Sequence, residues 1–270
     1  KIFKRDIIKS AQLLVHYFFW LNCIQHKIIK NKKMIKKIHR KALNIKHQWL
    51  AKKNPLSLNG RLKLYDNKMS LIESKLIPRG DFDDTVYSMY HSIEFNLIPK
   101  SVLEVILKNW SEIERALGAK GVLRSCNAYR NIHIPQNKRV KEFFSDAWHT
   151  DTIGTTNVQM FILLHDTNRK NGPFRYIKSQ DMQKVDNMYP DLKSSIKRSI
   201  NLNIDEKYIS YFTGSRGDFL FVSTFTNYHS ATIPDLGFKR DMISIAFEPK
   251  SLTSWKNTLC RGDVENLIDQ

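Results

Sequence analysis

The chain has little cysteine and no long apolar run, and each shortage excludes a class of protein. Its three cysteines, Cys23, Cys126 and Cys260, are far apart and form no Cys-x-x-Cys pair, so neither a disulfide framework nor a structural zinc site is expected. No apolar run reaches the roughly 18 residues of a membrane-spanning helix. We therefore expect a soluble protein of the reducing cytoplasm. With 270 residues, 41% of them hydrophobic, the chain can fill one sizeable core, which excludes intrinsic disorder.

Acidic residues are almost absent from the first 54 residues, which contain fifteen Lys or Arg and the single acid Asp6. This segment carries +14 of the formal net charge of +18, and the rest of the chain carries only +4. The basic character therefore belongs to the N-terminal segment, and the body of the protein need not act on a polyanion.

The N-terminal segment has the pattern of amphipathic helix. From Ile24, and with Asn31 counted in the row, apolar residues recur at steps of four and three with lysine and arginine between them: Ile28, Ile35, Ile38, Ala42, Ile45 and Trp49. The apolar stretch before it, Ala11 to Ile24, has no small-residue cleavage site after it and is interpreted as mature helix. Two interpretations stay open: helices packed on the body with a solvated lysine face, or an arm that binds anionic lipid or nucleic acid.

Four segments follow from the composition. The basic helical segment 1–54 ends at Asn54-Pro55, because a residue before proline is driven out of the helical region. Residues 55–118 are expected as helix and loop, with a helix over Val102 to Leu117 that ends at Gly118. Residues 119–250 contain short runs rich in β-branched and aromatic residues, which predict an antiparallel β core; residues 251–270 are expected as a tail. The predicted strands are Val122 to Ile134, Asn157 to His165, Phe174 to Ile177, Phe219 to Phe225 and Asp241 to Phe247.

The residues with the most chemical content are His149 and Asp151. In an extended chain, residues two apart point to the same side, so an imidazole and a carboxylate could bind one ion. Alone, His-x-Asp is as typical of a helix cap or a surface loop. A further histidine, His229, at the end of the strand that starts near Asp218, completes a set of two His and one carboxylate. That set holds non-haem Fe(II) with open positions for oxygen and substrate, which indicates catalysis.

Arg240 is predicted to lie beside this site. Pro234-Asp235-Leu236-Gly237 has the residues of a tight turn. If the two flanking strands pair across it, residue 231 faces 240 and 229 faces 242, so Arg240 points to the same face as His229. A buried guanidinium without an anion is costly, so this position indicates an acidic co-substrate.

These motifs resemble the phytanoyl-CoA hydroxylase-like family of Fe(II)- and 2-oxoglutarate-dependent dioxygenases. The motifs are Trp148-His149-Thr150-Asp151, then Asn171-Gly172-Pro173-Phe174 before a strand ending near Ser179, then Gly217-Asp218 before His229, and finally Arg240. They span about residues 121 to 249. The resemblance implies an α+β fold whose core is a double-stranded β-helix, jelly-roll and cupin-like, with the N-terminal helices packed around it.

Carried over by position, the resemblance implies iron bound by His149, Asp151 and His229, and 2-oxoglutarate bound through its far carboxylate by Arg240. It also implies consumption of O2 and release of succinate and CO2 as a C–H bond is hydroxylated. Asp151 excludes the halogenating relatives, which have a small residue at that position.

Four further residues are expected near the co-substrate on the same resemblance. Ser230 and Thr232 flank the position where relatives often have a hydroxyl residue that helps to hold 2-oxoglutarate. Asn127 and Tyr129 are expected behind the site. By contrast, His91, His133 and His165 are interpreted as ordinary hydrogen-bonded histidines.

Three functions are compatible with these features. The first is a small-molecule hydroxylase, favoured by the neutral body and by the lack of a nucleic-acid motif. The second is an oxygenase acting on nucleic acid or protein, docked by the basic helix, for which binding would weaken steeply with salt. The third is a non-catalytic module at a membrane surface, against which the intact ligand set argues.

Overall fold

The computed structural model of the protein describes residues 57–63, 77–78, 87–139, 146–151, 157–189, 203–250 and 257–269, all within the compact unit Lys53–Gln270. The basic segment 1–54, with its predicted helices, lies outside the described residues. Among the helices that the structure does describe, none combines the length and apolar content needed to cross a membrane.

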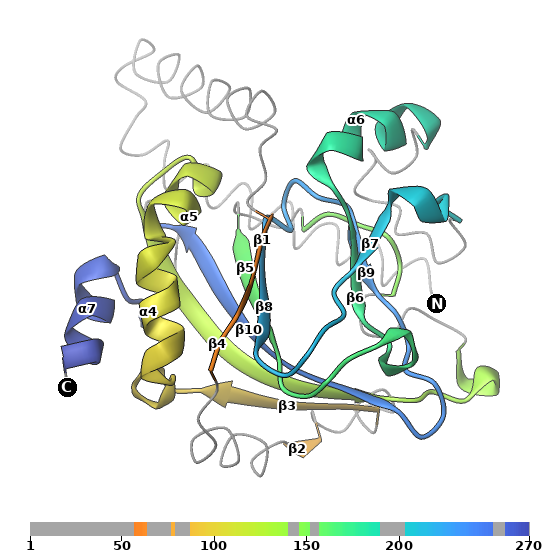
Figure 1. Cartoon of the computed structure of the whole chain (residues 1–270), viewed down its shortest axis with the longest axis horizontal. Coiled ribbons are helices and arrows are strands. Elements are labelled where there is room, and N and C mark those ends of the chain that lie inside the picture. Colours follow the sequence, from red (N-terminus) through yellow and green to blue (C-terminus); the bar gives the residue numbers. More distant parts are fainter. Residues whose placement is uncertain are drawn as a thin grey trace, which may run out of the picture. The chain divides into compact units, whose positions relative to one another are not determined.

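Two antiparallel sheets form the β structure (Figure 1). The larger sheet has the strand order β1-β8-β5-β10-β4-β3-β2, and the smaller has the order β7-β6-β9. Their bounds are β1 Ser57–Arg61, β2 Ile77–Pro78, β3 Ser88–Ile93, β4 Gly121–Ile132, β5 Val158–Leu163, β6 Phe174–Ile177, β7 Ile209–Tyr211, β8 Asp218–Val222, β9 His229–Ala231 and β10 Lys239–Pro249.

The sheets are accompanied by four α-helices and four short 3-10 helices in the described part of the chain. The α-helices are α4 Lys100–Lys108, α5 Trp110–Leu117, α6 Ser179–Met188 and α7 Arg261–Asp269. The 3-10 helices are η2 Phe95–Leu97, η3 Gln136–Lys138, η4 Arg169–Asn171 and η6 Glu206–Tyr208.

Strand β10 is the centre of the large sheet. It pairs with β4 on one edge and with β5 on the other, and every residue after Lys239 is buried. Its side chains alternate between the two faces: Ile243 and Ile245 join the core under the helices, whereas Met242 belongs to the apolar cluster on the opposite face. The predicted strand Asp241 to Phe247 is confirmed and is longer at both ends.

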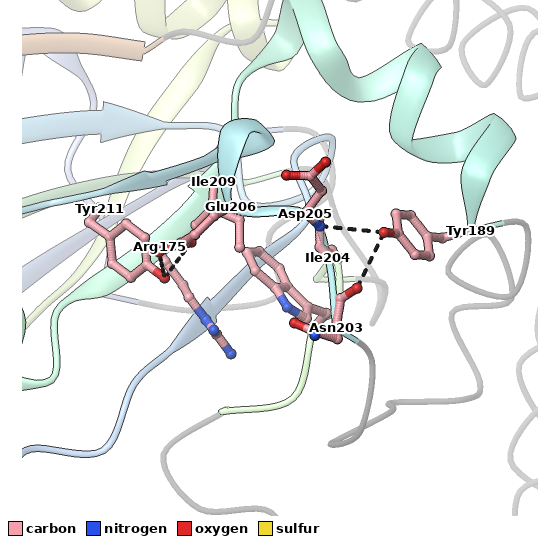
Figure 2. Close-up of a pocket in the computed structure, with 9 residues that line it drawn as sticks. Arg175, Tyr189, Asn203, Ile204, Asp205, Glu206, Ile209 and Tyr211 are labelled. Atoms are coloured by element: carbon pink, nitrogen blue, oxygen red, sulfur yellow. Dashed lines mark hydrogen bonds between the residues drawn. The ribbon is translucent and has the colours of Figure 1, made fainter.

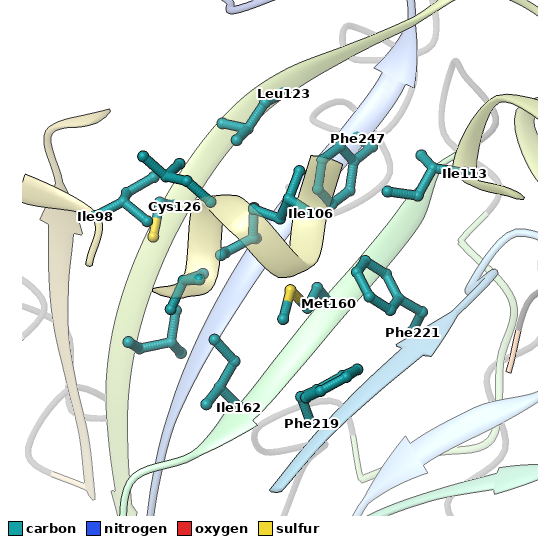
Figure 3. Packing of buried hydrophobic residues seen from close by; sticks show 14 of the residues in the cluster. Ile98, Ile106, Ile113, Leu123, Cys126, Met160, Ile162, Phe219, Phe221 and Phe247 are labelled. Carbon is teal, nitrogen blue, oxygen red and sulfur yellow. The ribbon is translucent and has the colours of Figure 1, made fainter. Parts of the chain in front are cut away.

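One face of the large sheet packs against α4 and α5. Ile106 of α4 and Ile113 of α5 are fully buried there, and Trp110 meets Phe247 edge-on with ring centroids 6.1 Å apart. Figure 3 shows Ile106 lying over residues of four strands: Leu123, Cys126, Met160, Ile162, Phe219, Phe221 and Phe247. Each such side chain contributes about 1.5–3 kcal/mol when fully buried, so this layer is the main stabilising core.

The predicted helix from Val102 to Leu117 is divided in two. Asn109 ends α4 and precedes α5, because its amide Nδ2 donates to Val105 O at 2.8 Å and its backbone leaves the helical region at φ −102° and ψ 6°. Such local bonding by asparagine competes with helix continuation. The end at Gly118 is confirmed, where a left-handed φ of 69° suits glycine.

The other face of the large sheet meets the small sheet. One apolar cluster contains residues of both, with Phe161 of β5 and Phe174 of β6 at a ring-centroid distance of 4.6 Å. Two antiparallel sheets sharing a core, with helices outside the larger one, make the described body jelly-roll-like, as predicted. The outer face of the small sheet is covered by a third cluster that includes Trp148, Met182 and Val185.

Two segments differ from expectation. Residues 55–118, expected as helix and loop, also supply β1, β2 and β3, because β1 hydrogen-bonds to the free edge of β8 and β3 to that of β4. Residues 251–270, expected as a tail, contain α7, whose Val264 is fully buried in the core beside α4.

Candidate metal centre

His149 and His229 come from separate stretches that the backbone joins. They form an isolated antiparallel bridge, with His149 N donating to His229 O at 3.1 Å and His229 N donating to His149 O at 2.9 Å. Asp151 N donates to Thr224 O at 2.9 Å, so a further backbone hydrogen bond joins the segment of His149 to the segment that precedes His229. His229 begins β9. The sequence had predicted it at the end of the preceding strand.

The three predicted ligands converge. Asp151 Oδ1 lies 3.7 Å from His149 Nε2 and 3.6 Å from His229 Nε2. The ligand atoms of the three residues all lie within 4.8 Å of one another. Both imidazoles are buried, at 6% exposure each, while Asp151 is half-buried. The expected convergence of two imidazoles and one carboxylate is therefore present.

Each imidazole is oriented by its own backbone. His149 Nδ1 lies 2.7 Å from Ala147 O, and His229 Nδ1 lies 3.0 Å from Asn227 O. A carbonyl can only accept, so each Nδ1 carries a proton. Each Nε2, on the side of Asp151, is therefore the atom that can offer a lone pair to a metal ion once it has lost its own proton. This is how metal-binding histidines are commonly held.

Asp151 is kept ionised by its neighbours. Burial by itself raises the pKa of Asp151, but the charge of His229, hydrogen bonds from Thr224 and Asn157, and the charge of His149 outweigh it and hold the pKa below 3.8. Asn157 Nδ2 donates to Asp151 Oδ2 at 3.3 Å, and Thr224 Oγ1 in turn donates to Asn157 Oδ1. Asn157 and Thr224 were not predicted as site residues, because nothing in their local pattern distinguishes them from other polar residues near a strand end.

This donor set fits a divalent first-row metal. Two ligands about 2.1 Å from an ion and at right angles lie about 3 Å apart, and the spacings of 3.7 and 3.6 Å from Asp151 to the two imidazoles are close to this value. Two imidazoles and one carboxylate on one side suit Fe(II) and leave positions open. The ring of Phe174, whose centroid lies 5.5 Å from that of His229, brings the apolar inter-sheet cluster up to this centre.

The hairpin proposed for Arg240 is wrong. β9 pairs with β6, and β10 has both of its edges occupied by β4 and β5, so the two strands do not pair with each other. The turn itself forms, with Phe238 N donating to Asp235 O at 3.0 Å and Gly237 at φ 81°. The strands that leave this turn enter different sheets, because β10 is buried in the centre of the large sheet and β9 pairs with β6 in the small one.

Arg240 nevertheless reaches the inter-sheet space. It is 3% exposed and lies on the same face of β10 as Met242. Its Nη1 donates to Thr232 O at 3.2 Å and to Gly172 O. Turning the Asn131 amide so that its oxygen faces Arg240 lets it accept from Nη2.

The charge of Arg240 lacks a carboxylate partner among the residues that the structure describes. Its Nε is buried without a hydrogen-bond partner. Burial lowers the pKa of Arg240 to about 10, although the nearby Tyr129 acts to raise it. A buried guanidinium with an orphaned donor fits an anionic ligand that would satisfy it.

The four other predicted residues are placed differently from one another. Tyr129 lies near Arg240 and beside the inter-sheet apolar cluster, and Asn127 is two residues away on the same face of β4, 3.4 Å from Ser125 Oγ. Thr232 donates its hydroxyl to Pro173 O at 2.9 Å. Ser230 alternates with His229 on β9, so it faces the other side of the sheet, where its Oγ accepts from Arg175 Nε at 2.7 Å.

His133 and His165 are hydrogen-bonded residues of the fold. His133 Nδ1 lies 3.0 Å from Pro234 O, and His165 Nε2 accepts from Asp241 N at 3.0 Å. Neither joins the cluster of ligand atoms found in the described residues.

Comparison with known proteins finds no family model and no curated sequence that matches the chain. Its fold is similar to several solved structures at low identity. The non-heme alpha-ketoglutarate-dependent epimerase SnoN from nogalamycin biosynthesis shares 11% identity over 77% of this chain and 84% of its own, with a TM-score of 0.48.

Two further structures have comparable similarity. HygX from Streptomyces hygroscopicus, solved with nickel and 2-oxoglutarate, shares 13% identity over 78% of this chain and 89% of its own, with a TM-score of 0.48. EctD from S. alaskensis shares 11% identity over 78% of this chain and 79% of its own, with a TM-score of 0.46. Similarity this low assigns no activity, and membership of the phytanoyl-CoA hydroxylase-like family stays a prediction.

Proposed function

We propose that the protein is an Fe(II)- and 2-oxoglutarate-dependent dioxygenase that hydroxylates a small molecule. The observation that carries this proposal is the convergence of His149, Asp151 and His229 within 4.8 Å. The buried, partly unsatisfied guanidinium of Arg240 supports the choice of an acidic co-substrate.

The chain's own residues have distinct roles in this proposal. His149 and His229 offer Nε2, and Asp151 offers a carboxylate oxygen, while Asn157 fixes the orientation of that carboxylate. Arg240 would pair with the far carboxylate of 2-oxoglutarate. When bound, Fe(II) and 2-oxoglutarate supply the oxidising chemistry: 2-oxoglutarate, O2 and a C–H bond give succinate, CO2 and a C–OH group.

An apolar wall lies beside the two imidazoles. Phe161, Phe174 and Tyr176 are each no more than 7% exposed, and Phe174 touches the ring of His229. A dry surrounding strengthens the attraction between Arg240 and a carboxylate, because the local dielectric is low.

The test is release of succinate from 2-oxoglutarate by the purified full-length protein with Fe(II), O2 and a panel of small molecules. His149→Ala and Asp151→Ala should abolish Fe(II)-dependent release, whereas His91→Ala should retain it. Retained release in both ligand variants would remove the site assignment. Stimulation by a nucleic acid or protein, lost at higher salt, would favour the second function instead.

A further inference from the structure

A cavity of about 500 Å³ lies on the outer face of the small sheet (Figure 2). In the pairing of β6 with β7 and β9, Arg175 is opposite both Tyr211 and Ser230, so these three side chains share one face. Phe174 and Tyr176 alternate with Arg175 and lie in the inter-sheet cluster. The cavity therefore lies on the side of the sheet turned away from the proposed iron ligands.

The cavity has an aromatic lining. Trp148 and Tyr211 line it from the sheet side, and Tyr189 lines it from the end of α6. The Tyr189 hydroxyl donates to Asn203 O at 3.2 Å and accepts from Asp205 N at 3.4 Å, and Figure 2 shows it facing this segment. The Tyr189 ring is thus fixed by backbone contacts before any ligand arrives.

The two acidic residues of the lining already have partners. Glu206 accepts from the Tyr211 hydroxyl at 3.0 Å and from Arg169 Nη1 at 3.1 Å. Asp205 pairs with Lys207 at 2.6 Å. Their charges are therefore compensated at the rim of the cavity.

Arg175 is the cation of the lining. Its contacts within the described part of the chain are with Ser230 Oγ, with Asp146 O at 3.4 Å, and with the ring of Trp148, whose centroid lies 4.7 Å from Cζ. These use two of the five N–H donors of a guanidinium, and no carboxylate is among the partners. Stacking on the indole fixes the plane of the fork and leaves donors for a ligand.

We propose that this cavity binds a small organic anion that has a carboxylate and a flat apolar body. The carboxylate would accept from Arg175, because the planar fork of arginine matches two oxygens in one plane. The body would lie among Trp148, Tyr189 and Tyr211. A volume of about 500 Å³ falls within the usual size of small-molecule sites. This site is separate from the proposed iron site and does not depend on it.

The test uses isothermal titration calorimetry of the full chain with benzoate, at constant ionic strength. Benzamide has the same shape without the charge, so it is the matched control ligand. Benzoate should bind once per chain with a dissociation constant in the millimolar range or tighter, and benzamide at least about tenfold more weakly, because a charge-assisted bond is lost. Equal binding of the two ligands, or no binding of benzoate, would overturn the proposal.

Variants locate the binding. Arg175→Gln should weaken benzoate binding at least about tenfold, whereas Arg115→Gln, an exposed arginine of α5, should not change it. If Arg175→Gln does not fold by circular dichroism, Tyr189→Ala, which removes one ring of the lining, should weaken binding severalfold. Benzoate affinity that is unchanged in the folded cavity variant, or that is lost in Arg240→Met, would place the anion elsewhere and contradict the site.

Discussion

Replacing Arg240 by methionine separates the two consequences of its buried charge. Burial lowers the pKa of Arg240 from 12.5 to about 10, and one pKa unit corresponds to about 1.4 kcal/mol, so holding this guanidinium charged costs the fold about 3 kcal/mol. Its bonds to Gly172 O and Thr232 O offset part of that cost. Removing both the charge and these bonds should therefore change the free energy of unfolding by less than about 2 kcal/mol.

Ligand binding should change far more than stability. Removing one partner of a buried, hydrogen-bonded charge pair costs about 2–5 kcal/mol, so the dissociation constant of 2-oxoglutarate should rise between about thirtyfold and several thousandfold. The matched control ligand is 2-oxopentanoate, which has the same chain with a methyl group in place of the far carboxylate. Its affinity should be nearly the same in the wild type and in Arg240→Met.

The assay is anaerobic titration of both keto acids into both proteins with Fe(II) present, together with urea denaturation of the ligand-free proteins. The difference between the two ligands in the two proteins gives the coupling energy between Arg240 and the far carboxylate. A coupling energy near zero would refute the role of Arg240, even if the variant bound both keto acids weakly.

Three other changes test the account. Asp241→Asn should lower the free energy of unfolding by about 2–4 kcal/mol at pH 7, because it breaks the buried pair with Arg130. Burial raises the pKa of Asp241, but Arg130 and Lys239 hold it below 3.8. The stabilisation is therefore complete above pH 3.8 and is lost as pH falls through the pKa of the folded protein. Urea denaturation should show the difference in unfolding free energy between the two proteins closing in that range. A gap that persists at lower pH would contradict this. Asn157→Ala should weaken Fe(II) binding about 10–100-fold in equilibrium dialysis, since it removes a donor to the carboxylate ligand; unchanged affinity would refute that positioning role. Gly172→Ala should lower the melting temperature much more than Gly237→Ala. Both glycines have positive φ, but a Cβ at Gly172 would collide with the backbone at Thr232 to Pro234, whereas Gly237 faces open space. Equal decreases in melting temperature would contradict the close approach at Gly172.

The sequence predicted strands best where turn residues bound a short apolar run. Phe174–Ile177 was predicted with its observed bounds because Gly172-Pro173 closes one end. The strand predicted over Phe219 to Phe225 ends earlier, at Val222. The strand that the family resemblance placed up to Ser179 ends at Ile177, since α6 begins at Ser179. Local propensity does not show where a ladder partner ends.

Pairing between distant strands was the part that local pattern could not supply. The turn before Gly237 was predicted from its residues, but the partners of β9 and β10 depend on burial of both faces of β10 by segments far along the chain. Arg240 lies near Thr232 because the two sheets pack against each other, and not because β9 and β10 pair as a hairpin. The three candidate metal ligands could be proposed from the sequence because their residue types restrict the chemistry, whereas Asn157 and Arg175 carry no such restriction.

The measurement that tests the central claim most directly is the iron content of the full chain after anaerobic equilibrium dialysis against Fe(II). We predict one tightly bound Fe(II) per chain in the wild type and in His91→Ala, and loss of that ion in His149→Ala, Asp151→Ala and His229→Ala, each confirmed as folded by circular dichroism. Iron retained at the same affinity in the three ligand variants, or absent from the wild type, would contradict it.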